Sequence, residues 1–195
     1  MSSTAATTAI DICSRALILI GADPITSFTE DTTEALVASN LYEDVARSQL
    51  CRTRWRFATE QAELAAHSSA PTGRFDIAHQ LPTNLLMINA ITIEDQPIKY
   101  TVYGDMVYSN SSSADTLVCD YIYRADEAEW ASYFIIALEH HLASIFATSI
   151  ARDAALSSLF EAKADDLMRK AKSIDSQQHT TRKLTTSRFL TERHS

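Results

Sequence analysis

The sequence predicts a mainly α-helical protein: a four-helix bundle with an inserted small antiparallel β unit and an extended C-terminal tail. In the N-terminal and C-terminal parts of the chain, apolar residues recur at the spacing of helices that bury one face. The middle collects Pro, Gly and β-branched residues. We expect a helical bundle formed by residues 1–68 and 126–177, a β-rich insertion over 69–125, and a tail over 178–195.

The composition is that of one folded domain. The 195 residues are 46% hydrophobic with only 3 Gly and 4 Pro, which is too apolar for a disordered chain. No apolar run approaches the roughly 20 residues that cross a bilayer, and the start lacks the pattern of a signal peptide. We therefore expect no membrane contact and a protein that is made and used in a cytosol. Cys13, Cys51 and Cys119 show no metal-binding or disulfide spacing.

The first helix follows from "TAIDICSRALILIGADP", whose apolar residues recur with helical spacing from Ile10 to Ile20 until Gly21 and Pro24 stop it. A second helix is expected from about Thr32 to Leu64, opened by a capping box of Asp31 and Glu34.

The middle region changes pattern after "SSAPTG". The stretches "NLLMINAITI", "IKYTVYG", "MVYSN" and "TLVCDYIYR" are rich in β-branched and aromatic residues. We expect antiparallel strands with turns near "EDQP", "YGD" and "SNSSSAD".

Helical spacing returns with a stripe that runs from Trp130 to Ile145, and a fourth helix follows with Asp153 as its N-cap. We expect the structural core of the protein to include five aromatic side chains, Tyr42, Trp55, Phe57, Trp130 and Phe134.

The sequence supplies no catalytic residues, metal ligands or cofactor site that we can assign. Three glycines cannot build a phosphate-binding loop, and no nucleophile elbow is present. His140 and His141 are adjacent, so on a helix they point about 100° apart rather than to one metal ion. Paired carboxylates such as Asp165 and Asp166, or Glu127 and Glu129, are explained by solvated helix faces.

The stretch "CRTRWRFAT" raises the question of nucleic-acid binding. On a helix, Arg52 and Arg56 would share one face and Arg54 would point nearly opposite, so no continuous basic stripe results. Packing of Trp55 in the core is the favoured interpretation.

Charge is unevenly distributed. The formal net charge is −8, but residues 176–195 carry +3, so the rest of the chain carries −11. An acidic body therefore ends in a basic tail.

The order of these signals resembles one known family. "ALILIGADPITSFTEDTTEA", "NLYEDVARSQLCRTRWRFAT", "FDIAHQLPTNLLMI" and the last two helical stretches follow each other as in the tail tubular protein A family, the head-to-tail adaptors of short-tailed bacteriophages. The likeness covers about residues 16–175. The segment "WRFA" of that family matches Trp55, Arg56, Phe57 and Ala58.

The resemblance implies a virion protein without catalytic residues or cofactors. It implies a ring of twelve copies beneath the portal protein, which continues the DNA channel and is a platform for the tail nozzle protein and the tail fibres. DNA would pass without specific binding, since an acidic lumen repels phosphates.

The tail is our candidate for portal binding. We hypothesise that its apolar residues anchor it while its basic residues meet acidic groups of the portal. These residues are Arg182, Lys183, Leu184, Arg188, Phe189, Leu190 and Arg193.

Three alternatives remain open at this stage. A head-completion connector of a long-tailed phage can share the helical plan. A glycan hydrolase would need two facing carboxylates in a cleft, and a nucleic-acid binder led by "RTRWR" would show steeply salt-dependent affinity.

Overall fold

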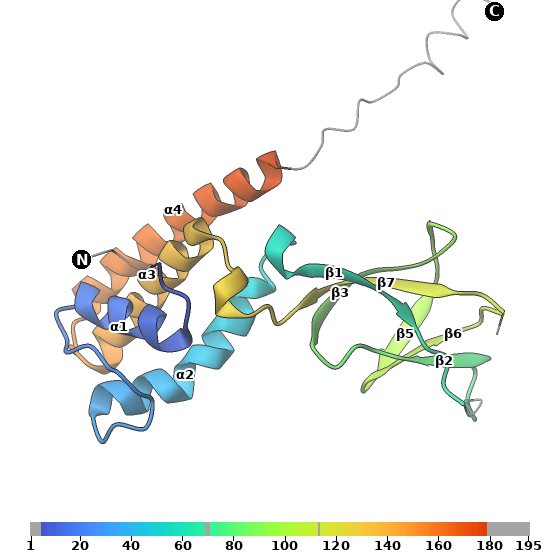
Figure 1. Ribbon diagram of the computed structural model, residues 1–195, viewed down its shortest axis with the longest axis horizontal. Coiled ribbons are helices and arrows are strands. Elements are labelled where there is room, and N and C mark those ends of the chain that lie inside the picture. The colour runs from blue at the N-terminus through green and yellow to red at the C-terminus, as the bar shows by residue number, and fades with distance from the viewer. Residues whose placement is uncertain (1–4, 69–70, 113, 179–195) are drawn as a thin grey trace, which may run out of the picture.

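A computed structural model describes residues 5–68, 71–112 and 114–178 and shows two lobes joined end to end (Figure 1). The helical lobe contains α1 (Ala9–Leu19), α2 (Thr33–Leu50), α3 (Ser132–Ser149) and α4 (Ala154–Gln177). The β lobe contains β1 (Thr59–Leu64), β2 (Ile77–Gln80), β3 (Leu85–Ile93), β4 (Gln96–Pro97), β5 (Tyr100–Tyr103), β6 (Met106–Ser109) and β7 (Leu117–Tyr123). We call the two connecting segments, residues 51–58 and 124–131, the waist; they include the short helices η1 (Arg56–Ala58) and η2 (Glu127–Glu129).

The prediction of a mainly α fold is wrong. The protein is 45% helical and 22% strand, with two antiparallel sheets of four and three strands, which makes it a mixed α/β fold. The sheets have the strand orders β1-β7-β3-β4 and β2-β6-β5. The β part is thus a lobe with its own core rather than a small insertion on a bundle.

The largest local error concerns the second helix, which was expected to continue to Leu64. Helix α2 ends at Leu50, and "TEQAEL" forms β1, antiparallel to β7, with Thr59 opposite Ile122 and Leu64 opposite Leu117. Glu, Gln, Ala and Leu prefer helices only weakly, so long-range pairing that buries Leu64 outweighs that preference. Strand β1 therefore precedes residue 69, where the β-rich part was expected to begin.

The helix starts are set by side chains that accept hydrogen bonds from free backbone N–H groups. The prediction that Asp153 caps α4 is confirmed, since its carboxylate accepts from the Leu156 N–H at 2.9 Å. Helix α2 starts one residue later than expected, because the cap is Thr32, which accepts from the Ala35 N–H at 3.2 Å. After α1 the chain turns at Gly21, whose φ of 78° favours glycine.

Helix α3 is the centre of the helical lobe and packs against α1, α2 and α4. Its buried side chains include Phe134, Leu138, Leu142 and Phe146, and they join one core with residues of all four helices. None of the described helices is long and apolar enough to span a membrane.

The β lobe has a second core. It is built from strands of both sheets, so the sheets pack face to face: Leu64, Ile91, Leu117, Cys119 and Tyr121 come from the larger sheet, and Val107 comes from the smaller. The expected turn at "EDQP" is formed by Glu94 and Asp95, which both have positive φ, at 49° and 61°. Two such residues suit a tight hairpin between β3 and β4.

Candidate functional site

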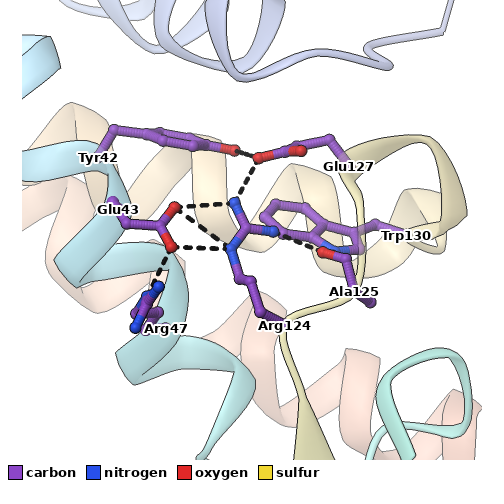
Figure 2. A network of polar contacts seen from close by, with 7 residues as sticks. All are labelled: Tyr42, Glu43, Arg47, Arg124, Ala125, Glu127 and Trp130. Atoms are coloured by element: carbon purple, nitrogen blue, oxygen red, sulfur yellow. Dashed lines mark hydrogen bonds and ion pairs between the residues drawn. The ribbon is translucent and has the colours of Figure 1, made fainter. Parts of the chain in front are cut away.

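The waist carries a connected network of polar contacts among the described residues and is our first candidate site. Its two segments lie side by side because one leads into β1, the other leaves β7, and these strands are paired. At its centre lies Arg124, whose backbone N–H donates to the Asn84 carbonyl at 3.1 Å. Figure 2 shows its side chain reaching from the end of β7 to α2 and to the η2 turn.

Arg124 holds two carboxylates in place. Its guanidinium donates to Glu43 on α2 at 3.0–3.2 Å and to Glu127 at 2.6 Å, and it lies 5.1 Å from the centre of the Trp130 ring. Only 18% of the Arg124 side chain is exposed. A planar group that binds two acids and stacks on an indole is rigidly positioned, so this side chain ties the helical lobe to the β lobe.

Two further side chains complete the network. Arg47, one turn along α2, donates to Glu43 at 2.6 Å, and the Tyr42 hydroxyl donates to Glu127 at 2.9 Å (Figure 2). Burial alone would raise the pKa of Glu43, but the hydrogen bonds and charges of the two arginines outweigh it and lower that pKa. Burial, followed by the Glu127 carboxylate, raises the pKa of Tyr42. The network therefore keeps the Glu43 carboxylate ionised and the Tyr42 hydroxyl protonated.

An aromatic cluster adjoins the Arg124 network through the Trp130 ring. Trp55 and Phe134 are fully buried with ring centres 5.0 Å apart, and Phe57 lies within 5.8 Å of Trp55 and 5.3 Å of Phe134. Trp130 meets Phe134 edge to face at 5.1 Å. Of the five residues expected in the core, Phe57 is half-buried and Tyr42 and Trp130 are buried. The structure brings four of them into this cluster and places Tyr42 in the Arg124 network.

The indole nitrogens of the cluster also have partners. Trp55 donates to the Gln49 carbonyl at 3.2 Å, and Trp130 donates to the Ala125 carbonyl at 3.0 Å. Trp55 is therefore fixed at both its ring and its nitrogen, and its ring faces are not accessible to a nucleic-acid base.

The three arginines of "RTRWR" do not lie on one α-helix, contrary to the geometry assumed from the sequence: Arg52 and Arg54 follow the end of α2, and Arg56 opens the short helix η1. Residues 53–55 are irregular, and the chain alternates so that Arg52, Arg54 and Arg56 are all exposed while Trp55 points inward. The helical spacing used to argue against a basic stripe therefore does not apply to these residues.

The end of α4 is pinned to this region by a buried carboxylate. Asp175 accepts from the Arg56 backbone N–H at 3.3 Å and from the Tyr133 hydroxyl at 2.6 Å. Burial and the hydrogen bond to Asp175 raise the pKa of Tyr133 to about 12. Helix α4 is thereby tied to α3 and to the waist two residues before its end at Gln177.

The tail residues proposed for portal binding lie outside the described residues. Arg182, Lys183, Leu184, Arg188, Phe189, Leu190 and Arg193 all follow Gln178, at which the described chain ends.

The two histidines and the pair Asp165 and Asp166 lie on α3 and α4. Glu127, which was expected on a solvated helix face, has a side chain only 17% exposed and belongs to the Arg124 network. The His140 ring is buried, with Nδ1 2.8 Å from the Ile136 carbonyl, and burial lowers the pKa of the neighbouring His141. Asp166 pairs with Lys170 at 2.6 Å, while Asp165 lies 3.4 Å from Arg52. No group of three potential metal ligands occurs among the residues that the structure describes.

All three cysteines are free thiols. Cys13 and Cys119 are buried and Cys51 is half-buried. Burial, together with the charge of Glu127, raises the pKa of Cys13 to about 12, and burial with Asp120 raises that of Cys119 to about 11. Both thiols therefore stay protonated and unreactive at neutral pH.

The end of the β lobe far from the helices, which we call the tip, carries a hollow of about 560 Å³. Its wall includes three aromatic rings, of Phe75, Tyr103 and Tyr108, whose centres lie 5.5–6.4 Å apart. Arg74 stacks on Phe75 at 5.1 Å and donates to the Tyr103 hydroxyl at 3.2 Å. Unlike the waist cluster, this one is partly open, with Tyr103 52% exposed.

Sequence reasoning missed the Arg124 network. The one available signal was an arginine placed directly after a strand with a glutamate three residues later, and such pairs are common on surfaces. The distance along the chain to Glu43 hides the most important contact.

In comparisons with known proteins, no family model matches this sequence, and no curated protein shows significant similarity to it.

Proposed function

We propose that this chain is a structural head-to-tail adaptor of a short-tailed bacteriophage. In this role, twelve copies form a ring beneath the portal protein, continue the DNA channel, and present a platform for the tail nozzle protein and tail fibres. The proposal starts from the resemblance of the sequence motifs to the tail tubular protein A family. It places the chain in the virion, at the portal vertex.

The observation that carries the proposal is that the resembling motifs form the joints of the fold. In "SFTED", the Glu30 carboxylate accepts from the backbone N–H groups of Thr26 at 2.7 Å and Ser27 at 2.9 Å, which closes the loop before α2. The motif "LYEDVARSQL" supplies Tyr42, Glu43 and Arg47 to the waist network. A motif set that specifies architecture rather than chemistry suits a structural subunit.

The remaining motifs support the same interpretation. "WRFA" supplies the two aromatic rings that face Phe134. In "QLP", the Leu81 N–H donates to the Asp105 carbonyl at 2.9 Å, and the Gln80 side chain donates to the Asp105 carboxylate at 3.0 Å. These bonds join the end of β2 to the turn between β5 and β6.

The surface of the helical lobe also suits a subunit of an assembly. Ile18, Leu36 and Leu159, on three different helices, are each more than half exposed. Single exposed apolar side chains also occur on monomers, whereas contiguous patches of them are typical of subunit contacts, so these three residues are compatible with an assembly.

The tail is proposed as the portal-binding segment, through the apolar and basic residues named above. The experiment is to add the purified chain to the portal ring of the same virus and to follow the mass of the complex with image classification. Twelve copies of a 21.6 kDa chain should add about 260 kDa at saturation and form a new ring at one pole. Absence of any gain at every ratio tested, with the chain folded, would contradict the proposal.

A shortened chain tests the role of the tail. Deletion of residues 179–195 should abolish the mass gain, because it removes the proposed anchor, while circular dichroism and the urea midpoint of the folded chain stay unchanged. Unchanged docking by the shortened chain would exclude the tail as the portal-binding segment. A ring at the head of a long-tailed particle would instead favour a head-completion connector.

A further inference from the structure

A group of five cations crosses the waist, in a protein whose net charge is −8. The group, which we call the basic strip, consists of Arg52, Arg54, Arg56, Arg169 and Lys172. Arg169 and Lys172 are three residues apart on α4 and share one face of that helix. Lys172 donates to the Arg52 carbonyl at 3.3 Å, which places the helix cations beside the exposed arginines of the waist.

Most of this positive charge is not balanced by nearby acids. Within the described residues, the ion pairs leave Arg54, Arg56 and Lys172 without a carboxylate at ion-pair distance. The other two cations have acidic partners: Arg52 meets Asp165 at 3.4 Å and Arg169 meets Asp166 at 3.5 Å, and these carboxylates are 57% and 46% exposed. The strip therefore presents a net positive surface to solvent.

The guanidinium groups are held in place by neutral acceptors. Arg54 donates to the Asn89 carbonyl at 3.3 Å, Arg56 donates to the Gln178 side chain, and Arg52 donates to the Gln49 side chain at 3.1 Å. These bonds restrict the side chains without neutralising them. Positioned arginines lose less entropy when they bind an anion.

The strip borders a hollow of about 520 Å³ between the waist and α4. Its wall combines three cations, Arg52, Arg169 and Lys172, with the apolar side chains of Ala162 and Met168. Asp165 completes the lining. From Arg169 to the end of α4 the strip extends about 12 Å along the helix axis. A surface of this length fits two or three carboxylates that are spaced along one helix or strand.

We infer that the basic strip is a docking surface for an acidic segment of a partner protein. Arginines beside apolar contacts are typical of protein interfaces. Nucleic acid is less well matched, because Trp55 is buried and cannot stack on a base and the chain as a whole is acidic. The inference relies on the proposed function only to identify the partner as the portal ring.

The sequence after the strip supports this choice of occupant. Arg56 of the strip donates to Gln178, the last described residue, and the sequence beyond it carries four more cations against one carboxylate, Glu192. Positive charge is thus concentrated in this part of the sequence.

The test compares two variants that each remove three positive charges. The strip variant is Arg54→Gln, Arg56→Gln and Lys172→Gln. The control variant is Lys99→Gln, Lys163→Gln and Lys170→Gln, in which Lys163 and Lys170 lie about 160–180° around α4 from Lys172. Fluorescence anisotropy measures binding of a labelled helical peptide with glutamates four residues apart, and of a labelled DNA duplex, and thermal unfolding checks that both variants fold.

We expect saturable binding of the glutamate peptide by the full chain, weakened about tenfold or more in the strip variant and less than about twofold in the control. No saturable binding, or equal loss in the two variants, would overturn the inference. Tighter, strip-dependent binding of the duplex would replace the acidic protein with nucleic acid as the partner.

Portal addition separates this inference from the proposed function. If the full chain docks on the portal ring and the strip variant docks equally well, the adaptor function stands and the strip is not its docking surface. If the peptide binds through the strip but the portal ring gains no mass, the adaptor function fails and the strip serves another acidic partner.

Discussion

The waist and the tip of the β lobe both carry aromatic clusters beside an arginine, yet they differ in burial. At the waist, Trp55 and Phe134 are fully covered because the chain crosses between the lobes there. At the tip, Tyr103 packs against Phe75 and Tyr108 but stays 52% exposed. Aromatic content alone therefore does not identify the core of this protein; coverage from both lobes does.

The two arginines extend the comparison. Arg124 binds two carboxylates from different elements and is largely buried. At the tip, Arg74 stacks on the Phe75 ring and donates to the Tyr103 hydroxyl, and within the described residues it meets no carboxylate at ion-pair distance. The waist is thus a cross-linked joint, whereas the tip is a surface that can change without loss of the fold.

The largest difference between the two clusters should appear when one ring is removed from each. Trp55→Ala leaves a cavity beside Phe134 and frees the Gln49 carbonyl, so we expect a loss of about 3–5 kcal/mol in the free energy of unfolding. Tyr103→Ala should cost under about 1 kcal/mol. Urea unfolding of both variants measures the difference, and equal losses would show that the waist is not the structural joint.

Structural features that depend on neighbouring residues in the sequence can be predicted from it, whereas features that depend on residues far apart in the chain cannot. The stripe from Trp130 to Ile145 and the Asp153 cap are local patterns, so α3 and the start of α4 follow from the sequence. Strand β1 does not, since "TEQAEL" has no β signature and forms a strand only because β7 lies beside it. Its partner residues are more than fifty positions away.

The waist shows the same contrast between features set by local sequence and features set by long-range contacts. Burial of Trp55 follows from its large apolar ring. The exposure of the arginines on either side of it depends on the end of α2 at Leu50, which local preference placed too late. The bond between Arg124 and Glu43 joins residues 81 positions apart, and no local pattern encodes it. Local reasoning thus identifies cores better than it identifies joints.

A smaller but more specific effect is expected from the two arginines that share Glu43. Arg124→Ala should lower the free energy of unfolding by about 2–3 kcal/mol, because it leaves two partly buried carboxylates without their donor. Arg47→Ala removes an ion pair whose arginine is 54% exposed and should cost about 0.5 kcal/mol or less. Denaturant unfolding of the two variants at low and high salt checks this, with stronger salt dependence expected for the Arg47 contact. Similar losses for both would mean that Arg124 does not join the lobes.

The smallest effect concerns pH and contrasts the waist with the interior of the helical lobe. Burial raises the pKa of Glu139, and its contact with Arg15 at 3.6 Å offsets only part of this. The folded chain then holds the Glu139 proton more tightly than the unfolded chain, so stability falls as the pH rises from the usual carboxyl value through the raised one. Glu43 has a lowered pKa, so its contribution is present above the usual value and is lost as the pH falls through the lowered one.

Substitution by glutamine separates the two carboxylates. Relative to the unchanged protein, the free energy of unfolding of Glu139→Gln should rise by up to about 1 kcal/mol as the pH goes from 4 to 7. The substitution removes a buried negative charge that Arg15 compensates only in part. Glu43→Gln should lose stability over the same range, because it removes a carboxylate that Arg124 and Arg47 hold ionised. Urea midpoints at pH 4, 5.5 and 7 give both trends. If Glu139→Gln is instead destabilised at pH 7, the Arg15 ion pair outweighs the cost of burial, and the helical interior stabilises its charge as the waist does.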